Sequence, residues 1–273
     1  MSAKPVVVIV DAYATARHLI PLFWERGYDL VHVQGQPSVP PEYAPSFRPS
    51  DFRACLVPTG DGAELLAAVA GHRPVAVLAG APSGADTADA LAEGLGLRTN
   101  GTRLSAARRE RPLMAAALRA AEVRGAGRLL DPGKPEGLTY HLNTVSLDGL
   151  HYLTDVWTSR HPAAEEERDP VDGLQLLPCR GAEQDMLAHS AFAVLDALGV
   201  HHGPARTRFE LTPEGPRPLG AGVGIRGVLP VLARQAIGES QLEWTVDAHV
   251  APERFRMRAA GDYVIRPGAL VCR

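Results

Sequence analysis

The chain has 273 residues, of which 45% are hydrophobic and 22% charged, and its formal net charge is −3. This length accommodates one large or two modest domains, each able to bury a core. The composition is that of an ordinary globular protein, and the small net charge gives no reason to expect nucleic acid or an acidic membrane as a partner.

Three cysteines, Cys55, Cys179 and Cys272, are too widely spaced to form a zinc-binding motif. Their number and spacing fit a reducing compartment. The N-terminus enters an apolar strand without a signal-peptide pattern, and no apolar run is long enough to span a bilayer. We therefore expect a cytoplasmic protein with no membrane association and no metal site.

Strands and helices alternate through the first 123 residues. Apolar runs that read as strands are separated by segments with helical periodicity, which indicates a parallel, doubly wound, Rossmann-like sheet. The first turn, residues 10–19, contains no glycine, so the pattern does not favour NAD or FAD. The predicted strands are 5–10, 28–33, 53–57 and 74–80, and the predicted helices are 14–27, 63–71 and 85–96.

The predicted boundary between two domains follows a helix. Residues 105–123 read as this helix, which Pro112 kinks or divides into two segments. Residues 124–137 are rich in glycine and proline and read as a linker. The expected organisation is a Rossmann-like domain over 1–123, the linker, and a second domain over 138–273.

The second half indicates an α+β domain with antiparallel strands. Residues 138–157 predict a hairpin that turns at Asp148-Gly149. A second hairpin over 203–222 turns at residues 213–215. Helices are expected over 182–200, 229–238 and 240–250.

Gly222-Val223-Gly224-Ile225-Arg226-Gly227 spells GxGxxG, the fingerprint of a dinucleotide-binding turn. Such a turn requires a parallel strand before it and, about twenty residues later, a second strand carrying an acidic residue. Here the glycines end an antiparallel hairpin and no such strand follows. The motif alone is weak evidence for a phosphate-binding loop.

The order of these segments resembles the ATP-grasp superfamily, and within it the carboxylate–amine (amino-acid) ligases of bacterial natural-product pathways. The segments that carry the resemblance are 100–123, 143–157, 197–219 and 233–255. The resemblance implies a Rossmann-like pre-ATP-grasp domain followed by an ATP-grasp domain. It also implies formation of an acyl phosphate from ATP, Mg²⁺ held by carboxylates, and a lid subdomain that closes over ATP.

The sequence departs from this family at most of the implied ATP and Mg²⁺ positions. Arg206-Thr207-Arg208 stands where the family resembles H-x-E, and residues 220–224 are Gly-Ala-Gly-Val-Gly where it resembles E-x-(N/G)-x-R. Arg111 replaces a family lysine. Only the fourteen residues 124–137 occupy the place of the lid subdomain, which is too short to form one. We therefore expect a reduced, lidless ATP-grasp domain that uses no ATP or Mg²⁺ and has no cofactor.

Exchanging carboxylates for arginines reverses the charge of the expected site, which would then repel Mg²⁺ and attract a carboxylate or phosphate. The resulting hypothesis is that the protein binds or converts a small anionic, amino-acid-like metabolite. Two alternatives stay open: an inactive partner or scaffold subunit of a biosynthetic ligase, and a conventional ATP-dependent carboxylate–amine ligase. The candidate protein partners are a second copy of the chain, in a homodimer, or a biosynthetic enzyme. The candidate substrate-binding residues are Arg206, Arg208, Arg226 and His141.

Proton transfer has two candidate residues on the first hairpin. His151 and Asp155 are four residues apart on one predicted strand, which would place both on one face and allow a general-base pair. For three other histidines we expect no functional role. His201 and His202 follow a helix end and are expected in a loop, and His249 is expected at the surface.

Overall fold

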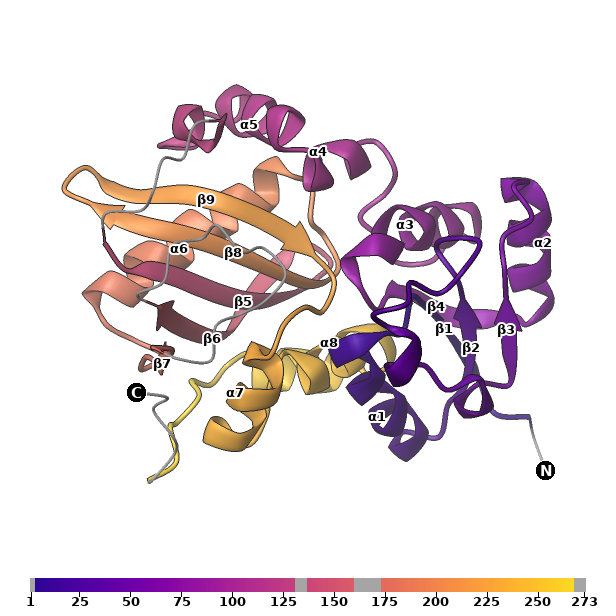
Figure 1. Ribbon diagram of the computed structural model, residues 1–273. Coiled ribbons are helices and arrows are strands. Elements are labelled where there is room, and N and C mark those ends of the chain that lie inside the picture. Colours follow the sequence, from indigo (N-terminus) through magenta and orange to yellow (C-terminus); the bar gives the residue numbers. More distant parts are fainter. Residues whose placement is uncertain (1–2, 131–136, 160–172, 268–273) are drawn as a thin grey trace.

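The computed structural model describes residues 3–130, 137–159 and 173–267. Two sheets lie side by side, a parallel one built from the N-terminal segment and an antiparallel one built from the second half (Figure 1). This mixed architecture confirms the predicted fold class. Residues 131–136, within the predicted linker, lie outside the described residues.

The parallel sheet has the strand order β3-β2-β1-β4. The central strand, β1, is buried along its whole length because helices cover both faces of the sheet. The strands are β1 (Val6–Val10), β2 (Asp29–Val33), β3 (Ala54–Leu56) and β4 (Pro74–Ala79), and the helices are α1 (Leu19–Glu25), α2 (Gly62–Gly71) and α3 (Ala85–Gly94).

The antiparallel sheet has the order β7-β6-β5-β8-β9 and contains both predicted hairpins. The first turns at Asp148-Gly149, where both residues have positive φ (53° and 83°), as a type I′ turn requires. The strands are β5 (Thr139–Leu147), β6 (Leu150–Ser159), β7 (Gln175–Leu176), β8 (Gly203–Thr212) and β9 (Gly215–Val223).

Three helices pack on the outer face of this sheet: α6 (Ala182–Ala197), α4 (Ser105–Arg109) and α5 (Arg111–Ala120). Pro112 is in the first turn of α5, so it starts a second helix rather than kinking one. Met114 and Leu118 of α5 share a buried cluster with Leu142 of β5. By packing, α4 and α5 thus belong to the second sheet although they precede residue 124; the predicted boundary itself stays a prediction.

Three helices follow β9, and the second of them connects the two sheets: α7 (Leu229–Ile237), α8 (Gln241–Val250) and α9 (Pro252–Arg258). Ser240 and Glu243 form a capping box at the start of α8. Leu242 and Val246 of α8 are buried in the same cluster as Ile9 of β1. On another side, Trp244 packs with Val145 of the antiparallel sheet. Helix α8 is therefore part of both cores (Figure 1).

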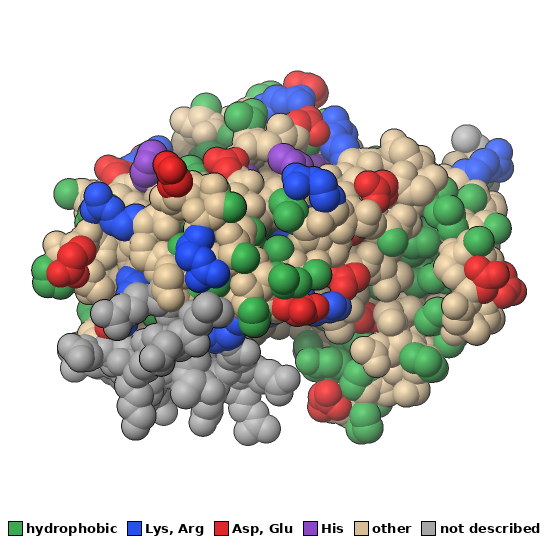
Figure 2. Space-filling view, turned by 90° about the horizontal axis from the view of Figure 1, so that it is seen from above, with side chains coloured by type: hydrophobic (Ala, Val, Ile, Leu, Met, Phe, Trp, Pro, Cys, Tyr) green, Lys and Arg blue, Asp and Glu red, His purple; other side chains and the backbone are tan. Residues whose placement is uncertain are grey.

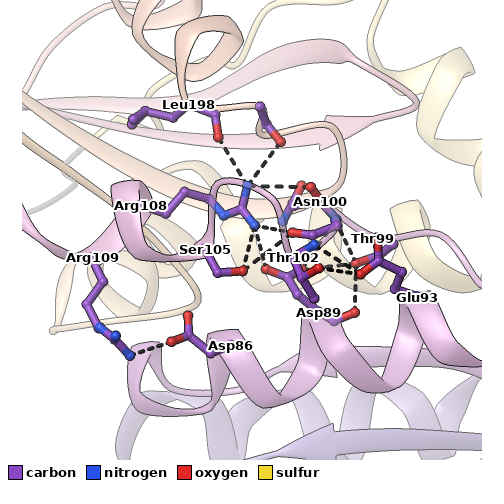
Figure 3. A network of polar contacts seen from close by, with 12 residues as sticks. Asp86, Asp89, Glu93, Thr99, Asn100, Thr102, Ser105, Arg108, Arg109 and Leu198 are labelled. Atoms are coloured by element: carbon purple, nitrogen blue, oxygen red, sulfur yellow. Dashed lines mark hydrogen bonds and ion pairs between the residues drawn. The ribbon is translucent and has the colours of Figure 1, made fainter. Parts of the chain in front are cut away.

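A buried arginine forms part of a second set of contacts between the two halves (Figure 3). Arg108 of α4 forms an ion pair with Asp89 of α3 at 2.9 Å and donates to the carbonyl oxygen of Leu198 at 3.1 Å. Asn100 Oδ1 accepts from the backbone N–H groups of His201 and His202, each at 2.8 Å. Burial outweighs the attraction of Arg108 and raises the pKa of Asp89. The network holds α3, α4 and the turn before β8 together.

Candidate functional site: an arginine-bearing sheet face

Two arginines lie on the inner face of the antiparallel sheet, which is the face turned away from α6. Arg206 and Arg208 are two residues apart on β8, so both side chains project from the same face. In the ladder with β5, Asn143 is opposite Arg206 and His141 is opposite Arg208. The fold therefore brings three of the four predicted substrate-binding residues onto one patch.

The fourth, Arg226, reaches the same patch from the loop after β9. In the ladder with β8, Gly220 is opposite Arg208 and Gly222 is opposite Arg206. A Cβ atom on Gly220 would be 3.2 Å from Nη2 of Arg208, and one on Gly222 would be 2.8 Å from Nη2 of Arg226. Both glycines thus leave room for a guanidinium group directly above the strand.

The glycines of the GxGxxG motif are therefore explained by the close approach of an arginine side chain and of a neighbouring loop. Gly224 has φ +90°, and a Cβ there would be 3.2 Å from the backbone of Ala81 and Pro82. Gly227 has φ +65°. The strand before the motif is antiparallel, and no strand follows it among the residues described through 267, so the motif is not part of a dinucleotide-binding unit.

The loop that carries Arg226 is anchored to both sheets. Arg206 Nη2 donates to the carbonyl oxygen of Arg226 at 2.7 Å. Ile225 N–H donates to Gly80 O at 3.1 Å, and the Thr15 hydroxyl donates to Gly227 O at 2.6 Å. These bonds fix the backbone from which the Arg226 side chain extends.

A buried carboxylate supports the same patch. Asp155 Oδ1 accepts from Asn143 Nδ2 at 2.6 Å and from Trp157 Nε1 at 2.7 Å, and Oδ2 accepts from the Thr154 hydroxyl at 2.9 Å. Asn143 Oδ1 in turn accepts from Arg206 Nε at 3.0 Å. Burial raises the pKa of Asp155 to about 6, although these donors and the Arg206 charge act in the opposite direction.

The predicted His151–Asp155 pair is wrong. The register between β5 and β6 shifts after Asn143, which is opposite Asp155, whereas Thr144 is opposite Leu153. Thr154 is thus the extra residue of a β-bulge, and the bulge moves Asp155 to the face opposite that of His151. His151 instead contacts Ser146 Oγ through Nδ1 at 2.7 Å and Asp196 Oδ1 through Nε2 at 3.1 Å.

That Ser146–His151–Asp196 chain resembles a hydrolase triad in residue type, but Ser146 is fully buried. A nucleophile must reach its substrate, so we assign these three residues a structural role where the sheet meets α6.

A second polar cluster lies where the two halves meet. His202 is in a loop, as expected, whereas the expectation that His249 is at the surface is wrong. Both side chains are buried, and their ring centroids are 4.4 Å apart. They line a cavity of about 30 Å³, which Asp89 and Arg98 also border. His249 Nδ1 contacts Thr245 O at 2.7 Å, whereas neither ring nitrogen of His202 has a hydrogen-bond partner among the described residues. Burial lowers the pKa of His202 to about 2 and that of His249 to about 4.

In the described parts of the chain, no cluster of three or more His, Cys, Asp or Glu side chains could hold a metal ion. No described helix has both the length and the apolar character needed to cross a membrane. On the face shown in Figure 2, acidic and basic side chains are interspersed rather than gathered into a field of one sign.

No family model matches the chain. It is 24% identical to dapdiamide A synthase of Enterobacter agglomerans, with 98% of this chain and 81% of that protein aligned. The L-amino acid ligase of Bacillus licheniformis superposes with a TM-score of 0.70 at 12% identity, covering 95% of this chain and 78% of the ligase. Phosphoribosylglycinamide synthetase of Anaerococcus prevotii gives 0.67 at 10% identity, covering 96% and 79%.

The chain shares its fold with these two enzymes, as the ATP-grasp resemblance implies. The three proteins named above are, by name, a synthase, a ligase and a synthetase.

The ATP-grasp resemblance implies ATP with bound Mg²⁺, and the residues at the implied metal positions do not fit Mg²⁺. Where the resemblance places metal-binding carboxylates, the sheet face has the guanidinium groups of Arg206 and Arg208 and the bare backbone of Gly220 and Gly222. A guanidinium group cannot ligate a cation and repels it. We therefore derive no step through Mg-ATP.

Sequence reasoning missed Asn143, Trp157 and the bulge at Thr154. The available signal was weak: Asn143 is one of several polar residues in its strand, and the adjacent polar pair Thr154-Asp155 is compatible with either alternation of faces.

Proposed function

We propose that this ATP-grasp-fold protein binds or converts a small anionic, amino-acid-like metabolite on its arginine-bearing sheet face, without Mg-ATP. The observation that carries the proposal is the gathering of Arg206, Arg208 and Arg226 over Gly220 and Gly222.

Electrostatics favours an anion at this patch. Arginine binds carboxylates and phosphates through charge-assisted, often bidentate hydrogen bonds. Asp155, whose charge interacts with Arg206, is fully buried and already accepts three hydrogen bonds, so it does not extend toward a ligand. All three arginines have contacts within the chain. A bound anion therefore exchanges with an existing contact, and we expect modest affinity.

The size of the chain supports the loss of the ATP lid. The alignment with dapdiamide A synthase has 358 positions, which exceeds the 273 residues of this chain by 85. At least that many positions of the relative have no counterpart here. The fourteen residues 124–137 are where we place this difference.

The test is calorimetric titration of the full chain with ATP plus MgCl₂ and, separately, with a panel of α-amino acids and their N-acyl derivatives. We expect no heat with Mg-ATP and saturable binding of at least one anionic compound. Arg208→Glu should abolish that binding. Arg119→Glu, on the exposed surface of α5, makes the same change in net charge and should leave it intact.

Two results would overturn the proposal. Binding of Mg-ATP that survives Arg208→Glu would restore the conventional ligase. Absence of any anion binding, together with co-purification of the chain with a full-length ligase, would favour an inactive partner subunit.

A further inference from the structure

The spacing of two guanidinium groups carries an inference about the chemical group that this site holds. It rests on the proposed function and concerns the same site. Gly220 and Gly222 are two residues apart on one face of β9, a separation of roughly 7 Å. Arg208 Nη2 lies above the first glycine and Arg226 Nη2 above the second. Because each Nη2 atom is close to the Cβ position of its own glycine, the strand repeat sets the approximate separation of the two guanidinium groups.

That separation suits one oxyanion placed between them. Two charge-assisted hydrogen bonds of about 2.8 Å, plus the width of a carboxylate or phosphate, span about 8 Å. A ligand with anionic groups at both ends would need the two arginines farther apart or directed away from each other. The geometry favours a single head group that accepts from both side chains.

Each arginine is held by a separate part of the fold. Arg208 extends from a central strand, β8. The Arg226 backbone is fixed by Arg206, whose own guanidinium is positioned by Asn143 and, through it, by Asp155. The bulge at Thr154 is what brings Asp155 to this face. Such support from surrounding hydrogen bonds is what a preorganised binding site needs.

We propose that Arg208 and Arg226 clamp a single carboxylate or phosphate group of the metabolite, and that Gly220 and Gly222 determine this specificity by leaving room for the two guanidinium groups. A side chain at either glycine displaces one arm of the clamp. Arg206 acts as a positioning residue for the second arm.

The experiment measures binding of acetate, succinate and inorganic phosphate to the full chain by calorimetry at constant ionic strength. We expect one site per chain, with succinate binding no more than a few-fold better than acetate. Arg208→Gln and Arg226→Gln should each weaken binding about ten-fold, the effect of losing a charge-assisted hydrogen bond. The ratio of phosphate to acetate affinity then distinguishes the two head groups.

Gly222→Ala tests the role of the glycine. Its φ is ordinary, and the new methyl group would be 2.8 Å from the Arg226 guanidinium, so the protein should fold while the arm moves. We expect binding to weaken several-fold. Gly62→Ala is the matched control, because a Cβ at that position in α2 has nothing within 4 Å, and it should bind as the unchanged chain does.

The outcomes separate this inference from the proposed function. Succinate binding more than ten-fold tighter than acetate, reduced to the acetate level by either arginine variant, would overturn the clamp in favour of two-ended recognition. If none of the three variants weakens binding, the clamp is also overturned. The proposed function would then depend on Arg206 as the anion-binding residue. Failure of the unchanged chain to bind any anion tested, here or in the wider panel, would overturn both.

Discussion

His202→Phe should make the protein more resistant to acid. The His202 ring is 6% exposed, its pKa is lowered to about 2, and its nitrogens have no hydrogen-bond partner among the described residues. In the unfolded chain the same group titrates near 6.5. The folded state therefore binds fewer protons than the unfolded state below pH 6.5, and stability is lost progressively as pH falls from that value.

The magnitude follows from the two pKa values. At pH 5.0 the unfolded imidazole is about 1.5 pH units below its pKa, whereas the folded one is still neutral, which costs about 2 kcal/mol of unfolding free energy. His249 and His32, whose pKa values are each lowered to about 4, add similar costs. Asp155 acts in the opposite direction: its raised pKa of about 6 means that proton uptake stabilises the fold by about 1 kcal/mol at pH 5.0.

Urea unfolding of both proteins at pH 7.5 and pH 5.0 measures the effect. The variant should differ from the unchanged protein by less than about 1 kcal/mol at pH 7.5, since no hydrogen bond is lost and the ring size is nearly kept. At pH 5.0 it should be about 2 kcal/mol more stable relative to that baseline. The exposed neighbour His201, substituted in the same way, is the control and should give no such gain. An equal stability difference at both pH values would refute the reasoning.

Three further substitutions test the fold around the site, each by urea unfolding at pH 7.5. Arg108→Met leaves the Asp89 carboxylate buried without its cation and should cost about 3–5 kcal/mol; a loss below 1 kcal/mol would show that the ion pair contributes little. Gly224→Ala places a side chain at φ +90° against the loop after β4 and should cost about 2 kcal/mol, whereas no loss would mean that the loop can shift. Asp61→Ala removes the N-cap of α2, which accepts from two backbone N–H groups, and should cost about 1 kcal/mol, an effect that Asp61→Asn should largely avoid.

Local sequence signals predicted most of the elements correctly. The apolar strands of the first half and the Asp148-Gly149 turn rely on interactions between near neighbours in the chain, so pattern and turn chemistry are enough to find them. The same holds for helix α1, which ends before Gly27 at φ +83°. The fold class followed from the order of these elements.

The candidate site was predicted in part. Arg206 and Arg208 share a face because a strand alternates regularly, and that alternation is visible in the sequence. His151 and Asp155 did not share a face, because one inserted residue in a bulge reverses the alternation after it. The bulge depends on hydrogen bonding across two strands, which a one-strand pattern does not contain.

The sequence by itself determined which residues form strands, helices and turns, and it determined that arginines and glycines stand where the ATP-grasp resemblance implies carboxylates. Only the tertiary structure decided what surrounds them. In the folded protein, His202 is buried against His249 between the two halves, and Asn143 connects Asp155 to Arg206 by hydrogen bonds. These contacts join residues from separate elements, up to 63 positions apart in the Arg206–Asn143 bond. Burial and long-range hydrogen bonding set the charge and position of such groups, and both depend on how the sheets and helices pack.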